Sequence, residues 1–149
     1  MRDLAVFRAL SDEDRRLLFE AFVATVMFRL ALYFFSIERL RRLAGRRGHG
    51  TRPVDRIVWA ARAAARRVPG TTCLSSALAL QRLLSANAQA SELHIGVTRD
   101  GGKFEAHAWV EQECRILIGE DERRAYTRLL SWRAAAGPPS LGADRIHPG

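Results

Sequence analysis

The chain has 149 residues, of which 48% are hydrophobic, so it is long enough for one domain with a hydrophobic core and too short for two. Its net charge of +8 comes almost entirely from arginine, since Lys103 is the only lysine. This excess predicts an acidic partner, for which peptide, protein, nucleic acid and membrane are the candidate classes. No nucleic-acid-binding motif accompanies the arginines, so we do not expect nucleic acid to be the partner.

The two cysteines, Cys73 and Cys114, and the amino terminus indicate the compartment. The first residues lack the charged, apolar and small-residue succession of a signal peptide, which predicts a cytoplasmic, reducing location without a disulfide. No CxxC pair or His/Cys spacing indicates a metal site, and we expect no cofactor.

The amino-terminal half is predicted to be helical. After a lead-in of residues 1 to 10, Ser11 and the acids that follow it begin a helix that continues to about Tyr33. Its most apolar part, Ala21 to Ile37, is only as long as a minimal membrane span and contains Arg29, so we interpret it as a buried helix, with a peripheral membrane contact as the alternative. Further helices are predicted over about 36 to 44 and 53 to 68.

The next segment, Pro69 to Leu84, places a cysteine where a loop becomes a helix. Proline and glycine end the preceding helix, Thr71 or Thr72 can cap the new one, and Cys73 falls in its first turn. Unpaired backbone N–H groups and the helix dipole favour a thiolate at this position, which a nucleophilic cysteine needs. The alternative is that Cys73 is a small buried apolar residue.

Beyond this helix the hydrophobic period changes from 3.6 to 2, which predicts strands over 93 to 98, 103 to 111 and 115 to 118. The fold class is therefore α+β, with a helical amino-terminal half packed on a small antiparallel sheet. A last short helix is predicted over 122 to 132. We expect a single domain over 1–149, with a helical part at about 11–68, a catalytic core at about 69–132 and a disordered tail at 133–149.

His107 lies 34 residues after Cys73, on the second predicted strand. A cysteine at a helix start followed by a histidine on an antiparallel strand is the order of papain-like and transglutaminase-like enzymes, in which a third polar residue orients the imidazole. If the following hairpin turns near Glu113, position 119 or 120 lies opposite the histidine. Glu120 is therefore the first candidate, and Asp121 is the alternative if either strand contains a bulge.

Each of these residues also has a structural interpretation. His107 is then a half-buried sheet residue, and Glu120 and Asp121 are acids that begin the last helix. We interpret His94 as an ordinary histidine on the sheet surface and Cys114 as incidental. Ser75 and Ser76 are interpreted as helix-surface residues, with donation to an oxyanion as the alternative.

Three segments carry a resemblance to a known family: Val68 to Leu80 (VPGTTCLSSALAL), His94 to Val97 (HIGV) and Ala106 to Glu111 (AHAWVE). Together they resemble the B2 (C-terminal B) proteins of lasso peptide biosynthesis, which belong to the transglutaminase-like cysteine peptidases. The resemblance covers roughly residues 54 to 132. The family pattern differs here in two respects: it commonly offers an aspartate where this chain has Glu120 and then Asp121, and it has proline and arginine where this chain has Ser75 and Ser76.

The resemblance implies a peptidase that removes the leader from a ribosomally made precursor. Its partners would be the precursor, a small leader-recognition protein of the B1 type and an ATP-dependent lasso cyclase. Cys73 would be the nucleophile and His107 the general base. The alternatives are an acyltransferase or transglutaminase-like enzyme with the same pair, and a non-catalytic scaffold that binds a peptide within a maturation complex.

Overall fold

The computed structural model describes residues 9–100, 102–119 and 127–134. Within these ranges four helices come first in the chain and the four strands of an antiparallel sheet follow, so the protein has the expected α+β fold. The helices are α2 (Asp12–Ala31), α3 (Ile37–Ala44), α4 (Val54–Arg67) and α5 (Cys73–Ala86). The strands are β1 (Ser91–Asp100), β2 (Lys103–Gln112), β3 (Arg115–Ile118) and β4 (Thr127–Ala134).

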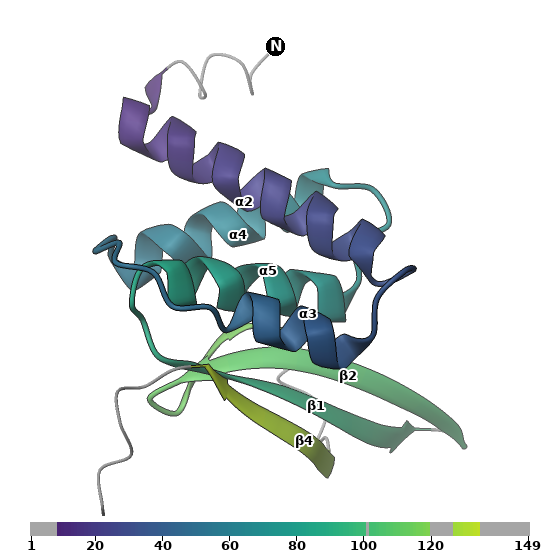
Figure 1. Cartoon of the computed structure of the whole chain (residues 1–149). Helices are drawn as coiled ribbons and strands as arrows, with labels where there is room; N and C mark the ends of the chain where they lie inside the picture. Colours follow the sequence, from purple (N-terminus) through teal and green to yellow (C-terminus); the bar gives the residue numbers. More distant parts are fainter. Residues whose placement is uncertain (1–8, 101, 120–126, 135–149) are drawn as a thin grey trace, which may run out of the picture.

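The helices form layers over one face of the sheet (Figure 1). α5 packs directly on β1 and β2, and α2 and α4 pack on α5 from the other side. α5 can occupy this central position because most of its side chains are apolar and small or branched, and Leu78, Leu80 and Leu84 are fully buried. They meet Leu93 and Val110 of the sheet in one hydrophobic core.

The sheet has the strand order β3-β2-β1-β4. β1 and β2 form a long hairpin in uninterrupted register, with Leu93 paired with Val110 and Gly96 paired with His107. Alternation along β2 therefore directs Ala108 and Val110 toward the helical layer, and His107 and Trp109 toward the opposite face. This division decides which of the candidate residues lie on the α5 side of the sheet.

The predicted last helix is wrong for residues 127–132, because they belong to β4. The spacing of the leucines permits a helix, but β4 instead pairs with the free edge of β1, from Ser91 opposite Ala134 to Val97 opposite Thr127. Pairing satisfies the backbone groups of β1 that β2 leaves open, and this tertiary gain exceeds local helix propensity. Arg133 and Ala134, which we expected in the tail, also belong to this strand, and the rest of that segment is outside the described residues.

The interpretation of Ala21 to Ile37 as a buried helix is also wrong for one side of α2. One face of α2 is buried, but Phe22, Val23, Met27 and Leu30 are exposed. The described part of the chain contains no helix with the length and apolar character needed to span a bilayer.

Candidate active site

Cys73 is the first residue of α5, and the cap that starts this helix is formed by Thr72. The Thr72 hydroxyl oxygen accepts a hydrogen bond from the Ser75 N–H at 3.2 Å, and the Ser75 hydroxyl oxygen accepts one from the Thr72 N–H at 3.0 Å. This reciprocal capping box fixes the first turn. Thr71 takes a different part, since its hydroxyl donates to the Val68 carbonyl at 2.6 Å. Ser75 is fully buried in the cap and is thus a structural residue rather than a surface one.

The half-buried Cys73 opens into a cleft of about 250 Å³. The cleft lies between three elements, α4, α5 and the end of β3. Its lining residues are Arg62, Ala65, Arg66, Cys73, Ser76, Ile118 and Gly119. A thiol that starts a helix and faces an open cleft is accessible to a substrate carbonyl, and the first-turn N–H groups of the helix lie beside it.

Arginines of α4 form one wall of the cleft, which the sequence pattern did not single out. Arg62 donates two hydrogen bonds to the Leu117 carbonyl, from Nε at 3.1 Å and from Nη2 at 2.8 Å. Arg66 lies one turn further along the helix and is exposed. Only the packing of α4 against β3 shows that these two share a cleft with the thiol.

His107 is half-buried on β2, and its Nε2 lies 2.7 Å from the carbonyl oxygen of Gly119. Because a carbonyl oxygen can only accept, Nε2 carries the proton, and in the neutral ring the basic nitrogen is then Nδ1. The imidazole also stacks with Trp109, with ring centroids 6.4 Å apart and planes inclined by 19°. These contacts define both the tautomer and the plane of the imidazole.

The structure brings Cys73 and Gly119 to the same cleft, whereas His107 is not among the described residues that line it. His107 points to the face of the sheet opposite α5, together with Trp109 and His94. Gly119 is the residue that connects the two sides, since it lines the Cys73 cleft and accepts the hydrogen bond from His107.

Gly119 is constrained in two ways. Its φ of +88° is in the region that favours glycine, and a Cβ atom there would lie 2.7 Å from the Ala108 carbonyl oxygen and 2.8 Å from Cβ of Trp109. No L side chain fits without a shift of β2. The end of β3 is therefore held close against β2, which keeps the Gly119 carbonyl within reach of His107.

The hairpin between β2 and β3 turns at Glu113 and Cys114, both of which have positive φ. Gln112 pairs with Arg115 and Glu111 with Ile116, as expected for a turn centred near Glu113. The register then shifts by one residue, so that Val110 pairs with Ile118. Glu120 and Asp121, the candidate third members, lie outside the described residues.

His94 is not the surface residue that we expected, because only 1% of it is exposed. Its Nδ1 lies 2.7 Å from the Ser131 hydroxyl, and its Nε2 lies 3.6 Å from Glu92 and 3.5 Å from Glu111. Burial and the nearby Arg128 lower the pKa of His94 below its usual value, against the opposing effect of the two carboxylates. The signal that could have revealed this was the shared face with Trp109.

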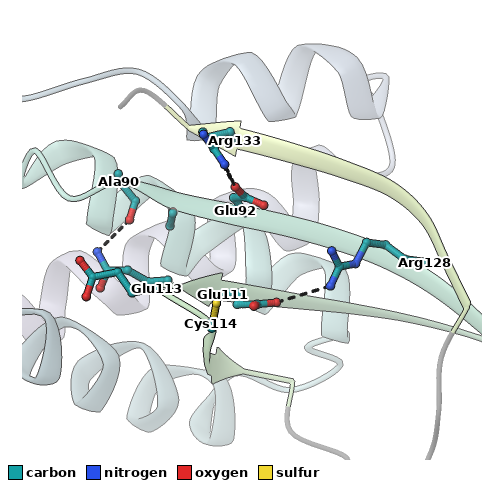
Figure 2. Close-up of a pocket in the computed structure, with 9 residues that line it drawn as sticks. Ala90, Glu92, Glu111, Glu113, Cys114, Arg128 and Arg133 are labelled. Carbon is teal, nitrogen blue, oxygen red and sulfur yellow. Dashed lines mark hydrogen bonds and ion pairs between the residues drawn. The ribbon is translucent and has the colours of Figure 1, made fainter. Parts of the chain in front are cut away.

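Figure 2 shows a second cleft, of about 500 Å³, at the other end of the hairpin. The Glu92 carboxylate accepts a hydrogen bond from Arg133 Nε at 2.7 Å. The Glu111 carboxylate lies 3.7 Å from the Arg128 guanidinium. The exposed Cys114 lies at the turn beside these pairs. Since its charges are largely paired with one another, this cleft carries no chemistry comparable to that of Cys73.

Of the two remaining histidines, only His49 is described, and it lines neither cleft. His49 is exposed in the segment between α3 and α4, and His147 lies outside the described residues. Among the residues that the structure describes, no three His, Cys, Asp or Glu side chains are grouped so that they could hold a metal ion.

The fold and the site together describe an α+β domain in which a cysteine begins the helix that packs on an antiparallel sheet. A family model for the transglutaminase-like superfamily matches residues 17–131. The chain therefore belongs to the transglutaminase-like superfamily. Comparisons with curated proteins and with solved structures gave no match.

Proposed function

We propose that this protein is a cysteine peptidase that removes the leader from the ribosomally made precursor of a lasso peptide. The observation that carries the proposal is the position of Cys73 at the amino-terminal end of α5, open to a cleft, in a chain of the transglutaminase-like superfamily. The PGTTCL and AHAWVE segments, which resemble those of B2 proteins, support the choice of substrate class.

In the proposed reaction His107 accepts the thiol proton at Nδ1, and the Cys73 thiolate attacks the scissile carbonyl carbon. The backbone N–H of Cys73 stabilises the resulting oxyanion. Collapse of the adduct breaks the C–N bond, the amine leaves with the proton from His107, and water hydrolyses the thioester. Since His107 points away from the α5 side of the sheet, this mechanism requires a conformational change that brings its Nδ1 to the Cys73 thiol when substrate binds.

The third member of the site is proposed to be Asp121 rather than Glu120. The uninterrupted hairpin assumed from the sequence pairs position 120 with His107, but the bulge after Glu111 adds one residue on the β3 side. A one-residue bulge in either strand is the condition under which Asp121 takes the place of Glu120. Without a hydrogen bond from His107 to that carboxylate, the Gly119 carbonyl by itself can hold the imidazole in the tautomer that carries the proton on Nε2.

The proposed partners are the precursor, a leader-recognition protein of the B1 type and an ATP-dependent cyclase. Arg62 and Arg66 line the cleft beside Cys73 and suit an acidic segment of a peptide, and Arg62 is held in the wall by its hydrogen bonds to the Leu117 carbonyl. Cys73 and His107 could also transfer the acyl group to an amine instead of to water, so an acyltransferase is the second candidate activity.

The decisive experiment measures precursor cleavage by mass spectrometry in the presence of the recognition protein. Cys73→Ala and Cys73→Ser should each lower turnover roughly a thousandfold or more, because no other nucleophile replaces the thiolate. Cys114→Ser is the matched control and should cleave like the wild type. Near wild-type turnover of Cys73→Ala would exclude the proposed mechanism, and a product carrying an added amine would favour acyl transfer.

Alkylation distinguishes an enzyme from a binding scaffold. Cys114 is exposed and Cys73 is half-buried, so exposure alone predicts that iodoacetamide labels Cys114 first. An activated Cys73 should nevertheless react faster at neutral pH. Slow labelling of both cysteines, or faster labelling of Cys114, would favour the scaffold.

A further inference from the structure

α2 has two apolar faces, of which the fold uses one. The buried face packs on α4 and α5, and its residues are Leu17, Ala21, Ala24, Thr25 and Phe28. The opposite face, here named the α2 outer face, consists of Phe19, Phe22, Val23, Met27 and Leu30. Phe19 is 68% exposed, and the other four are between 37% and 47% exposed. Spacings of three and four residues place all five on one side of the helix.

The outer face continues into an aromatic turn at the carboxyl end of α2. Tyr33, Phe34 and Phe35 are 73%, 81% and 51% exposed. Figure 1 shows α2 as the helix farthest from the sheet, so the outer face lies along the outside of the molecule. Eight exposed large apolar side chains on one helix and the turn that follows it exceed what a protein without a binding role usually exposes.

Glu20 and Glu38 flank this surface, but the charges that follow it in the chain are mostly basic. From Ala21 to Ile37 there is no acidic residue, and the only charged one is Arg29. α3 and the residues after it then present exposed arginines, namely Arg39, Arg42, Arg46 and Arg47. The chain as a whole carries +8. Two copies would therefore repel each other, which disfavours a second copy as the occupant, whereas an anionic surface would be attracted.

We propose that the α2 outer face and the aromatic turn dock on an anionic lipid surface, with α2 lying in the plane of the interface. An apolar helix face suits lipid, because hydrocarbon offers no polar partner. Exposed aromatic residues followed by arginines are typical of membrane interfaces, where the rings lie at headgroup level and the guanidinium groups meet lipid phosphates. The proposal takes up the peripheral membrane contact that the sequence left as the alternative to a buried helix.

The test is co-sedimentation of the full chain with vesicles of phosphatidylcholine alone or mixed with phosphatidylglycerol. The wild type should bind the mixed vesicles, and binding should weaken as salt rises. Phe19→Ser and Phe34→Ser should each lower the partition coefficient about tenfold, since each removes a large apolar side chain from the lipid. Arg42→Gln combined with Arg46→Gln should reduce binding to mixed vesicles only.

Phe104→Ser is the matched control, because Phe104 is 74% exposed on β2 and should leave vesicle binding unchanged. Absence of wild-type binding to the mixed vesicles would overturn the proposal, and so would equal binding to both vesicle types. An equal loss in Phe104→Ser would attribute binding to general hydrophobicity and overturn it as well. If the protein instead self-associates in solution and Phe19→Ser abolishes the association, the occupant is a second copy. None of these outcomes depends on peptidase activity.

Discussion

The conformation of Gly119 is the residue-scale feature that most directly concerns His107. Alanine at this position would pay for a positive φ, about 1 kcal/mol or more, and would also push β3 away from β2 through the contact with the Ala108 carbonyl. The hydrogen bond to His107 would lengthen as a result. We expect Gly119→Ala to lower the kcat of precursor cleavage more than tenfold and to shift its pH profile.

Gly102 provides the control for this prediction. Its φ is +85°, but a Cβ atom there would meet nothing within 4 Å. Gly102→Ala therefore carries the same backbone strain without the displacement, and should lower the unfolding free energy while leaving the pH profile of cleavage unchanged. Equal effects of both variants on cleavage would show that strain, rather than orientation of His107, is responsible.

His94 should make stability depend on pH. Its folded-state pKa is lowered from 6.5, so the unfolded chain binds the proton more readily and folding stability is lost as pH falls below about 6.5. Above that pH the contribution is fully present. The charges facing the ring are those of Glu92, Glu111 and Arg128.

Urea denaturation measured above and below pH 6.5 checks this expectation. The wild type should lose up to about 1.4 kcal/mol per pH unit in the affected range, and His94→Gln should have a flatter profile. His49→Gln, at an exposed position, should keep the wild-type slope. A slope unchanged in His94→Gln would assign the pH dependence to another group.

At the scale of elements, the bulge in the β2–β3 hairpin bears on the proposed third member of the site. The bulge predicts that Asp121→Asn lowers turnover substantially, by about tenfold to a thousandfold, and that Glu120→Gln has a smaller effect. Both variants should still bind the precursor. Turnover and binding measured for the two variants settle the assignment, since the reverse ranking would assign the role to Glu120. No loss in either would leave the Gly119 carbonyl as the orienting group.

Local patterns predicted most of the elements. The helices at 36–44, 53–68 and after Cys73, and the strand at 115–118, lie within one or two residues of the observed ones, because caps, prolines and periodicity are local signals. β4 could not be predicted, because what makes it a strand is the open edge of β1. The exposure of Phe22 and Leu30 could not be predicted either, since a helix that is apolar on all sides normally has neighbours on all sides.

The candidate site could be predicted only in part for a similar reason. The cap on Cys73 is encoded within four residues, so Thr72 was one of two predicted capping residues, but the part that Ser75 takes in the cap was not predicted. The positions of Arg62 and Arg66 in the cleft depend on how α4 packs against β3, which no local pattern reveals. The contact between Gly119 and His107 uses a backbone carbonyl, which every residue has, so the identity of residue 119 gives no signal for it. The family match confirms the superfamily to which the cysteine and histidine segments pointed.

At the scale of the whole molecule, the positive charge should govern precursor binding. If Arg62 and Arg66 hold an acidic segment, the affinity of Cys73→Ala for a labelled precursor should fall as salt rises, because exposed charges are screened beyond about 8 Å at physiological ionic strength. Fluorescence anisotropy over a salt series measures this dependence. An affinity that does not change with salt would instead indicate apolar docking.

Arg66→Gln should weaken precursor binding and reduce the salt dependence, because it removes a charge from the wall of the cleft. Arg16→Gln is the matched control, since the Arg16 side chain is 78% exposed and lies on α2. If both variants weaken binding equally, the attraction comes from net charge rather than from the cleft.

The strand order has a consequence for the way the chain folds. β3 and β4 follow one another in sequence but occupy opposite edges of the sheet. The β1–β2 hairpin needs only a short loop to close, whereas β4 must reach β1 across the hairpin, which costs more chain entropy before any contact forms. The helical layer and hairpin are therefore expected to assemble first, and β4 to join last. Amide protons at the β1–β4 seam should accordingly acquire protection from hydrogen exchange later during refolding than those between β1 and β2.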